Sequence, residues 1–338
     1  MLIAILIVVV LLIAALIGLY AAYHKVCYSP LKTMSETESP KVITNHPYHE
    51  KARENVRTLA ETPCIFVHTR SFDGLRLSAR YYEGQEDKPL CLCFHGYRGS
   101  AFRDYSAIGL YLIRQGYNVL IVDERAHWRS QGHTITYGIN ERRDVLSWIN
   151  YCKKRFGQDI PMLVFGISMG GATVLMASGL ELPDNVKGII ADCPYNVPKD
   201  IINHVCRKVH LNPTICWPII RLSSIIYGRF NIMETSAEEA VKHATKPILI
   251  LHGEADGFVP MHMSKEVQEA NPELVEWHSF PEAGHGLSMY YDEERYTSIM
   301  NDFIERCLKE KAPEAEDAPA VEDVSESETS PEGENVSE

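Results

Sequence analysis

The sequence lacks an excess of basic residues, which limits the partners that the chain can bind. Its 338 residues include 33 Lys and Arg against 45 Asp and Glu, a net charge of −12. Ten of the acidic residues lie in residues 312–338, where no Lys or Arg occurs, so residues 1–311 have a net charge of only −2. Since nucleic-acid binding requires a basic surface, this nearly neutral part excludes nucleic acid as a partner.

The chain also lacks a C-x-x-C pair of the kind that binds zinc, and its nine cysteines are an odd number. Several lie in apolar runs, such as Cys91 and Cys93. This pattern is typical of reduced core cysteines rather than of a disulfide framework, and it favours a reducing compartment. The sequence predicts no metal site and no cofactor.

No Lys or Arg precedes the uncharged apolar run at residues 2–23. At about 1.5 Å per residue in a helix, these 22 residues can cross a hydrocarbon core of about 30 Å. A signal peptide would have a basic start, a shorter apolar core and a small-residue cleavage site. Tyr20, Tyr23 and Tyr28 stand where interfacial anchors belong, so we predict a retained membrane helix over 1–23.

The flanks of this helix predict its orientation in the cell membrane. Lys25, Lys32 and Lys41 follow it, so the positive-inside rule places the following domain in the cytoplasm. Residues 24–48 are largely polar and contain three prolines, which predicts a tether. The acidic tail at 312–338 has no aromatic residue and is rich in Pro, Ser and Glu, so we predict that it is disordered.

Between residues 49 and 311, short apolar segments alternate with helical runs. Two strand-like segments joined at Asp73-Gly74 predict an N-terminal hairpin. The later alternation predicts a mostly parallel central sheet with helices on both faces, in the α/β class. The expected strands are residues 65–72, 75–82, 89–94, 119–122, 161–165, 186–191, 247–251 and 275–280.

The alternation stops over residues 195–244, where no convincing strand occurs. Apolar patches at 215–220 and 222–227 predict a helical insertion. In an enzyme of this plan, such an insertion is a cap that covers the active site and lines a pocket. The alternative is that the insertion only packs onto the domain.

The sequence GISMGG at 166–171 connects a buried strand to a small-residue helix, which is typical of a nucleophile elbow. Ser168 stands at the corner, in a strained conformation that leaves no room for side chains two positions away. Gly166 and Gly170 meet that demand because they have no Cβ. The helix N-terminus also favours negative charge on an oxygen beside Ser168.

A serine nucleophile needs a base and an acid that orients the base. Asp256 lies in a loop after the strand at 247–251, and His285 lies in a loop after the last strand. In parallel sheets both loops are at the edge where active sites assemble. Glu254 competes for the acid role, but it directly follows the glycine that ends its strand.

These motifs resemble the α/β-hydrolase superfamily, in its serine aminopeptidase-like and esterase-like branch, and are similar to membrane-anchored bacterial hydrolases. The resemblance implies the α/β-hydrolase fold, with Ser168 as nucleophile, His285 as general base and then acid, and Asp256 as orienting acid. It further implies an oxyanion hole made by the backbone N–H groups of Tyr97 and Met169. The motifs that carry it are HGYRG at 95–99, GISMGG at 166–171, HGEADGFVP at 252–260 and AGHG at 283–286.

One segment departs from that pattern. Ala126 and Trp128 flank His127 where similar proteins carry glycines. We therefore expect a differently shaped rim at this side of the site.

The predicted reaction is acyl transfer to water through an acyl-enzyme. The membrane helix and the apolar insertion favour a small-molecule or lipid-like acyl substrate: a carboxylic ester, a thioester or a lysolipid. Two alternatives stay open. One is a serine aminopeptidase-type peptidase, and the other is a non-catalytic, membrane-tethered binding protein on a hydrolase fold.

Overall fold

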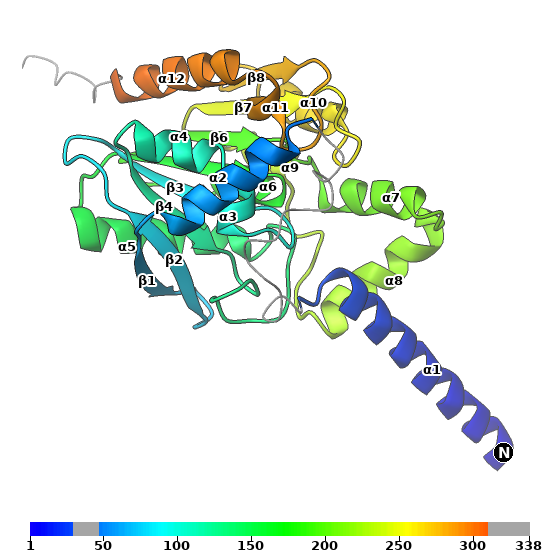
Figure 1. Cartoon of the computed structure of the whole chain (residues 1–338). Coiled ribbons are helices and arrows are strands. Elements are labelled where there is room, and N and C mark those ends of the chain that lie inside the picture. The colour runs from blue at the N-terminus through cyan, green and yellow to red at the C-terminus, as the bar shows by residue number, and fades with distance from the viewer. Residues whose placement is uncertain (30–46, 310–338) are drawn as a thin grey trace, which may run out of the picture.

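The computed structural model describes residues 1–29 and 47–309, which form one eight-stranded sheet with helices around it (Figure 1). The strand order is β1-β2-β4-β3-β5-β6-β7-β8. β2 runs antiparallel to β1 and to β4, and all other neighbouring pairs are parallel. The mostly parallel sheet with an N-terminal hairpin is therefore confirmed. The strands are β1 Ile65–Arg70, β2 Arg76–Tyr82, β3 Leu90–Phe94, β4 Asn118–Asp123, β5 Met162–Ile167, β6 Val186–Asp192, β7 Ile248–Gly253 and β8 Val275–Phe280.

Two hydrophobic cores lie on opposite faces of this sheet. In β3, Leu90, Leu92 and Phe94 belong to one core, whereas Cys91 and Cys93 belong to the other. Successive side chains of a strand point to opposite faces, so a strand buried on both faces is apolar throughout. This explains why β3 and β4 read as uninterrupted apolar runs in the sequence.

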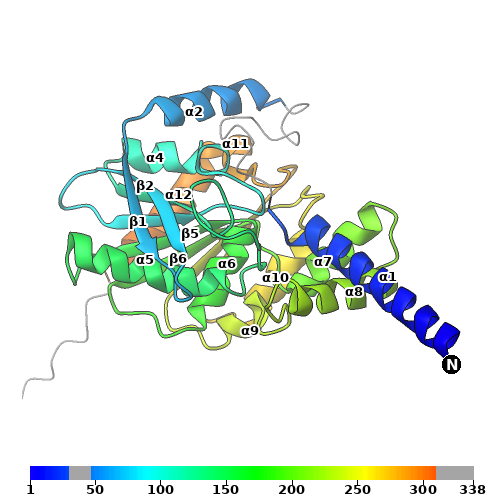
Figure 2. The same cartoon turned by 90° about the horizontal axis from the view of Figure 1, so that it is seen from below.

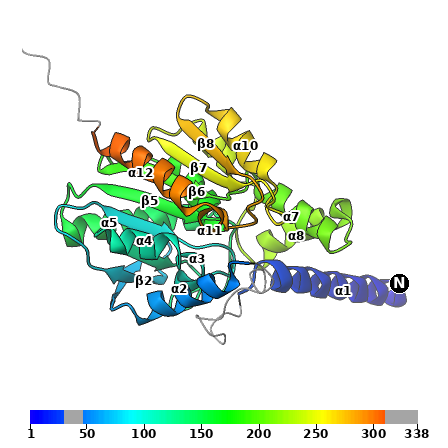
Figure 3. The same ribbon diagram turned by 45° about the horizontal axis from the view of Figure 1, so that its top comes forward.

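The helices divide between these two faces (Figures 1 and 3). One core contains residues of α5 Glu141–Phe156, α6 Met169–Ser178 and α10 Met261–Ala270. The other contains residues of α2 His49–Glu61, α4 Ile108–Arg114, α11 Ser288–Tyr291 and α12 Glu293–Lys309. Between β3 and β4 a short helix, α3 Ala101–Asp104, precedes α4.

Three helices and no strand occupy the insertion between β6 and β7. They are α7 Pro198–Lys208, α8 Pro213–Ile226 and α9 Ala237–Val241. Both α7 and α8 begin with a proline, the residue best suited to the first helical position. Figure 2 shows α7 and α8 at the same end of the molecule as α1 Leu2–Val26.

The N-terminal helix α1 is long and apolar, with a mean hydropathy of 3.5 over its most apolar 18 residues. It is the one helix of residues 1–29 and 47–309 that is long and apolar enough to cross a membrane, although a signal sequence meets the same criteria. Most of its side chains are exposed, and it points away from the domain (Figure 1).

The junction between α1 and the domain differs from the prediction. The helix continues to Val26, and Cys27 is fully buried. The N–H of Ser29 donates to the carbonyl of His133, and the N–H of Ile135 donates to that of Cys27. The predicted tether at 24–48 therefore begins too early, because its first residues pair with the domain. Residues 30–46 of that tether, and the predicted acidic tail at 312–338, lie outside the described residues.

Candidate active site

The turn between β5 and α6 is a tight elbow with Ser168 at its corner. Ser168 has φ 55° and ψ −116°, a conformation that a residue with a side chain rarely adopts. Its N–H donates to the carbonyl of Asp192 at 2.8 Å. A Cβ on Gly166 would lie 2.2 Å from the carbonyl oxygen of Gly170, and a Cβ on Gly170 would lie 2.0 Å from that of Phe94. Both glycines are therefore required by close backbone approach.

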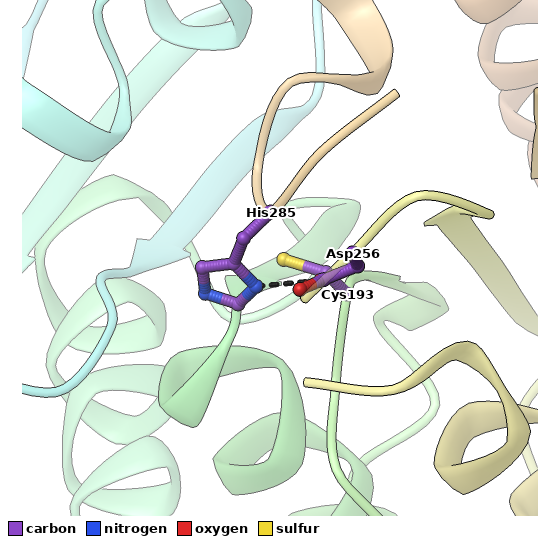
Figure 4. Close-up of side chains that lie close together, drawn as sticks. All are labelled: Cys193, Asp256 and His285. Atoms are coloured by element: carbon purple, nitrogen blue, oxygen red, sulfur yellow. Dashed lines mark hydrogen bonds and ion pairs between the residues drawn. The ribbon is translucent and has the colours of Figure 1, made fainter. Parts of the chain in front are cut away.

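The structure brings Ser168, Asp256 and His285 together at the carboxyl edge of the parallel strands. Nε2 of His285 lies 2.9 Å from Oγ of Ser168. Nδ1 of the same ring lies 2.6 Å from Oδ2 of Asp256, and Figure 4 shows this pair. The imidazole is thus within hydrogen-bond reach of both the hydroxyl and the carboxylate, which is the geometry that nucleophilic catalysis needs.

The carboxylate of Asp256 is buried and fully hydrogen-bonded. Its Oδ1 accepts from the N–H groups of Phe258 and Val259, each at 2.8 Å. Its Oδ2 faces His285 and also lies 3.3 Å from Nε2 of His252. Burial acts to raise the pKa of Asp256, but the charge of His285 and the hydrogen bonds from both imidazoles outweigh it and hold this pKa well below its ordinary value. The group is therefore a carboxylate at neutral pH.

The competing acid, Glu254, lies elsewhere. Its Oε1 accepts a hydrogen bond from Oγ of Ser279 at 2.7 Å, on the exposed surface. Of the two acidic residues in this loop, Asp256 is the one beside the imidazole.

The imidazole of His285 is partly buried, with 18% of its side chain exposed, and packs against the ring of Phe258, with 5.1 Å between the ring centroids. Burial acts to lower the pKa of His285, but the negative charge of Asp256 and its hydrogen bond outweigh burial, so the pKa lies above its ordinary value. The Asp256 carboxylate thus makes the ring a stronger base toward Ser168.

The backbone N–H groups of Tyr97 and Met169, expected to form an oxyanion hole, belong to residues near Ser168. Within the described ranges, neither group donates a hydrogen bond to another residue, and both residues line a cavity that reaches Ser168. Met169 begins α6, where the helix dipole adds partial positive charge. The turn that carries Tyr97 is held by Asp104, whose Oδ2 accepts from the N–H of Gly96 at 2.8 Å.

Two cavities open onto Ser168. The small cavity, of about 290 Å³, also reaches His285 and includes the ion pair of Arg103 and Asp104 in its wall. The large cavity, of about 500 Å³, extends from Ser168 between α7 and α8. Its wall is almost entirely apolar, with Ile201, Ile202, Val205, Cys206, Ile219 and Ile220 from these two helices. Both cavities thus offer space beside Ser168, and the small one has charged groups in an otherwise mostly apolar wall.

Comparisons with known proteins agree with this architecture. Residues 85–225 match the family described as serine aminopeptidase, S33, and residues 220–319 match the dienelactone hydrolase family. In solved structures, the Pyrococcus furiosus esterase Pf2001 superposes with a TM-score of 0.60 at 20% identity, covering 80% of this chain and 97% of that chain. The ferulic acid complex of Est1E from Butyrivibrio proteoclasticus superposes with a TM-score of 0.53 at 23% identity, covering 72% of this chain and 99% of that chain. The chain belongs to the α/β-hydrolase superfamily.

Two proteins with similar sequences match this α/β-hydrolase over two thirds or more of its chain. The uncharacterized protein YqkD of Bacillus subtilis is 22% identical over 300 residues, which covers 87% of this chain and 94% of YqkD. Lysophosphatidylserine lipase ABHD12 of Danio rerio is 26% identical over 242 residues, which covers 67% of this chain but only 61% of the lipase. The predicted superfamily and fold are thus confirmed.

The end of α1 is a part of the site that the sequence did not reveal. Lys25 and Val26 line the large cavity of the hydrolase. Oη of Tyr97 donates to the carbonyl of Val26 at 2.7 Å, and Nη2 of Arg98 donates to those of Lys25 and Tyr28 at 3.0 and 2.9 Å. The last turn of α1 therefore fixes the loop that carries one of the two free N–H groups.

Ala126 and Trp128 lie in a loop at the rim of the site. Ala126 and Trp128 have φ of 64° and 42°, in the region that favours glycine. Nε1 of Trp128 donates to the carbonyl of Gly99 at 2.7 Å, and Nε2 of His127 accepts from the N–H of Arg98 at 3.1 Å. This rim loop thus braces the turn at 95–99 through the side chains of His127 and Trp128.

Cys193 lies next to the pair of Asp256 and His285 (Figure 4), and donor atoms of the three lie within 4.8 Å of one another. Burial raises the pKa of Cys193 well above its ordinary value, so the thiol stays protonated and is a poor metal ligand. The facing atoms of Asp256 and His285 are already hydrogen-bonded to each other. The chemistry of this donor set therefore fits a triad with a buried thiol beneath it better than a metal centre.

Proposed function

We propose that this α/β-hydrolase is a membrane-anchored serine hydrolase that cleaves a carboxylic ester, a thioester or a lysolipid. The observation that carries the proposal is the hydrogen-bonded row of Ser168, His285 and Asp256 at a strained elbow beside an apolar cavity. A non-catalytic binding protein has no need of this combination.

In the proposed reaction, Oγ of Ser168 attacks the carbonyl carbon while Nε2 of His285 takes the hydroxyl proton. The N–H groups of Tyr97 and Met169 stabilise the tetrahedral oxyanion. His285 then gives its proton to the leaving alcohol or thiol, and an acyl-enzyme forms. Water, deprotonated by the same imidazole, releases the acid. Asp256 holds the ring with Nδ1 protonated throughout.

The large cavity supports an acyl substrate with an apolar chain. Its aliphatic wall stabilises methylene groups removed from water, at about 0.8 kcal/mol for each CH₂. The names of two relatives agree with this substrate class, since one is an esterase and the other a lysophosphatidylserine lipase. Our proposal therefore places the acyl chain in the large cavity and the leaving group in the small one.

The peptidase alternative draws on the serine aminopeptidase family. Such an enzyme needs a charged side chain to fix a peptide terminus, and the insertion offers Arg207, Lys208, Arg221 and Arg229. None of these four lines either cavity that reaches Ser168 in the described part of the chain. The insertion therefore supplies no such group beside Ser168, and the apolar wall of the large cavity favours an ester with an acyl chain.

The test compares p-nitrophenyl esters of increasing chain length with aminoacyl p-nitroanilides. We expect turnover of the esters and little of the anilides, and loss of ester turnover in Ser168→Ala. A preference for the anilides overturns the esterase assignment. Full activity in Ser168→Ala overturns the nucleophile.

We further propose that α1 anchors the protein in the cell membrane, with the catalytic domain in the cytoplasm. Its 25 helical residues have no acidic side chain, and its only Lys is close to its C-terminal end. The test is protease treatment of intact and opened cells. Digestion of the domain in intact cells contradicts the orientation, and recovery of the chain in the soluble fraction contradicts the anchor.

A further inference from the structure

An apolar stripe runs along the outer face of α8. Ile215, Ile219, Leu222 and Ile226 are spaced four, three and four residues apart, which places them on one side of the helix. Their exposed fractions lie between 40% and 63%. A contiguous exposed apolar surface of this kind marks an interaction site in a folded protein.

The stripe is continuous with the large cavity. Val209 and Leu211, in the turn between α7 and α8, are exposed by 58% and 53%. Both of them, and Ile219 of the stripe, also line the large cavity. The apolar surface therefore surrounds the mouth of the space that leads to Ser168.

Helix α8 contacts α1 within the part of α1 that would lie in the membrane. Oη of Tyr227, at the end of α8, donates to the carbonyl of Leu16 at 3.0 Å, and its ring lies 5.4 Å from that of Tyr20. Along a helix, Leu16 is about 21 Å from Leu2, whereas a hydrocarbon core is about 30 Å thick. α8 runs crosswise to α1 in Figure 1, so it extends along the membrane surface when α1 spans the bilayer.

The charge of this segment also fits a lipid surface. Residues 201–233 contain no Asp or Glu, although the whole chain has a net charge of −12. The exposed basic residues of this segment lie at the end of α7, on α8 and just after α8, and such residues are attracted to anionic headgroups. They are Arg207, Lys208, Arg221 and Arg229.

We propose that the turn between α7 and α8 and the apolar stripe of α8 form a second membrane-contact surface. This surface lies in the bilayer interface beside α1 and presents the mouth of the large cavity to the lipid. Acyl substrates then enter sideways from the bilayer without crossing water. The proposal rests on the proposed membrane anchor and, for its substrate, on the proposed esterase activity.

The direct test measures depth and needs no activity. The full chain is placed in vesicles of phosphatidylcholine and phosphatidylglycerol, with an environment-sensitive fluorescent amino acid at position 215. The matched control carries it at position 308, because Leu308 is an exposed apolar residue on α12, remote from α1 (Figure 3). We expect brominated lipids to quench the probe at 215 and not at 308.

Equal quenching at both positions overturns the proposal. A blue-shifted probe at 215 without lipid quenching also overturns it, because a second copy of the chain then covers the stripe. Failure of the chain to co-float with vesicles contradicts the anchor itself, and the surface proposal fails with it.

A kinetic test uses the double variant Ile215→Glu, Leu222→Glu, since neither residue lines a cavity. We expect hydrolysis of soluble p-nitrophenyl butyrate to stay within about twofold, which also shows that the variant is folded. Hydrolysis of a long-chain ester embedded in vesicles should fall by about tenfold or more, because two apolar anchors are lost. The control Leu308→Glu should change neither rate.

Equal rates of the double variant and wild type on the vesicle substrate overturn the proposal. If wild type cleaves neither substrate, the proposed esterase activity is wrong, and the depth measurement still decides the membrane contact.

Discussion

The acyl-chain preference that we propose for the hydrolase follows from the large cavity, and a substitution at one position in its wall should change it. Val205 of α7 is partly buried and lines this cavity. Each methylene that moves from water into the cavity contributes about 0.8 kcal/mol, which corresponds to about a fourfold increase in kcat/KM. From butyrate to octanoate, four methylenes should therefore raise kcat/KM on the order of 200-fold in wild type.

The perturbation is Val205→Trp, whose indole fills the space that those methylenes occupy. We expect kcat/KM for octanoate to fall by most of the 200-fold gain, whereas that for butyrate stays within about threefold. The assay is release of p-nitrophenol from butyrate, hexanoate and octanoate esters below their critical micelle concentrations. Leu308→Trp, on the surface of α12, is the matched control and should leave the series unchanged.

Two results would refute this reasoning. A wild-type series that is flat from butyrate to octanoate shows that the chain does not enter the large cavity. An equal loss for all three esters in Val205→Trp shows that the substitution damages the site rather than the chain-binding space.

Four further predictions concern the site and its attachment to α1. Asp256→Asn should lower kcat by about 10⁴-fold, as expected for a lost orienting charge, and should move the acid limb of the pH profile to lower pH. In wild type the midpoint of the acid limb should lie above pH 6.5, because the pKa of His285 is raised from 6.5 and only the neutral ring accepts a proton. A midpoint of this limb below pH 6 contradicts the prediction. Gly170→Ala should abolish turnover and lower Tm, because the methyl group of the alanine would lie 2.0 Å from the carbonyl oxygen of Phe94. A variant with unchanged Tm and unchanged turnover contradicts the tight elbow. Deletion of residues 2–28 should lower butyrate hydrolysis at least about tenfold, because it frees the turn that carries Tyr97, whose N–H group we propose as an oxyanion donor. Deletion of 2–15 should not lower it, and equal rates of the two deletion variants contradict that coupling.

The elbow and the strand alternation could be predicted because their causes are local. Gly166 and Gly170 are required by contacts within one strand–turn–helix unit, so their spacing around Ser168 is visible in the sequence. The runs in β3 and β4 are apolar because both faces of the sheet are covered, which again is a pattern along one segment.

The parts that could not be predicted depend on contacts between segments far apart in the chain. The carbonyl of Val26 accepts from Tyr97 across 71 positions, and a polar stretch after an apolar helix has no local sign of such packing. Asp104 holds the turn at Gly96 through a side chain that nothing in its own segment singles out. Likewise, Asp123 ends a strand but forms a buried ion pair with Arg80, a partner that only the sheet register brings to it.

The measurement that tests the central proposal most directly is labelling by a fluorophosphonate, which reacts with an activated serine. The purified full chain is treated with the probe, digested, and analysed by mass spectrometry. We expect one modified residue, Ser168, with no labelling in Ser168→Ala and much slower labelling in His285→Ala. Labelling of another residue at the same rate, or undiminished labelling and ester hydrolysis in Ser168→Ala, would contradict the proposed mechanism.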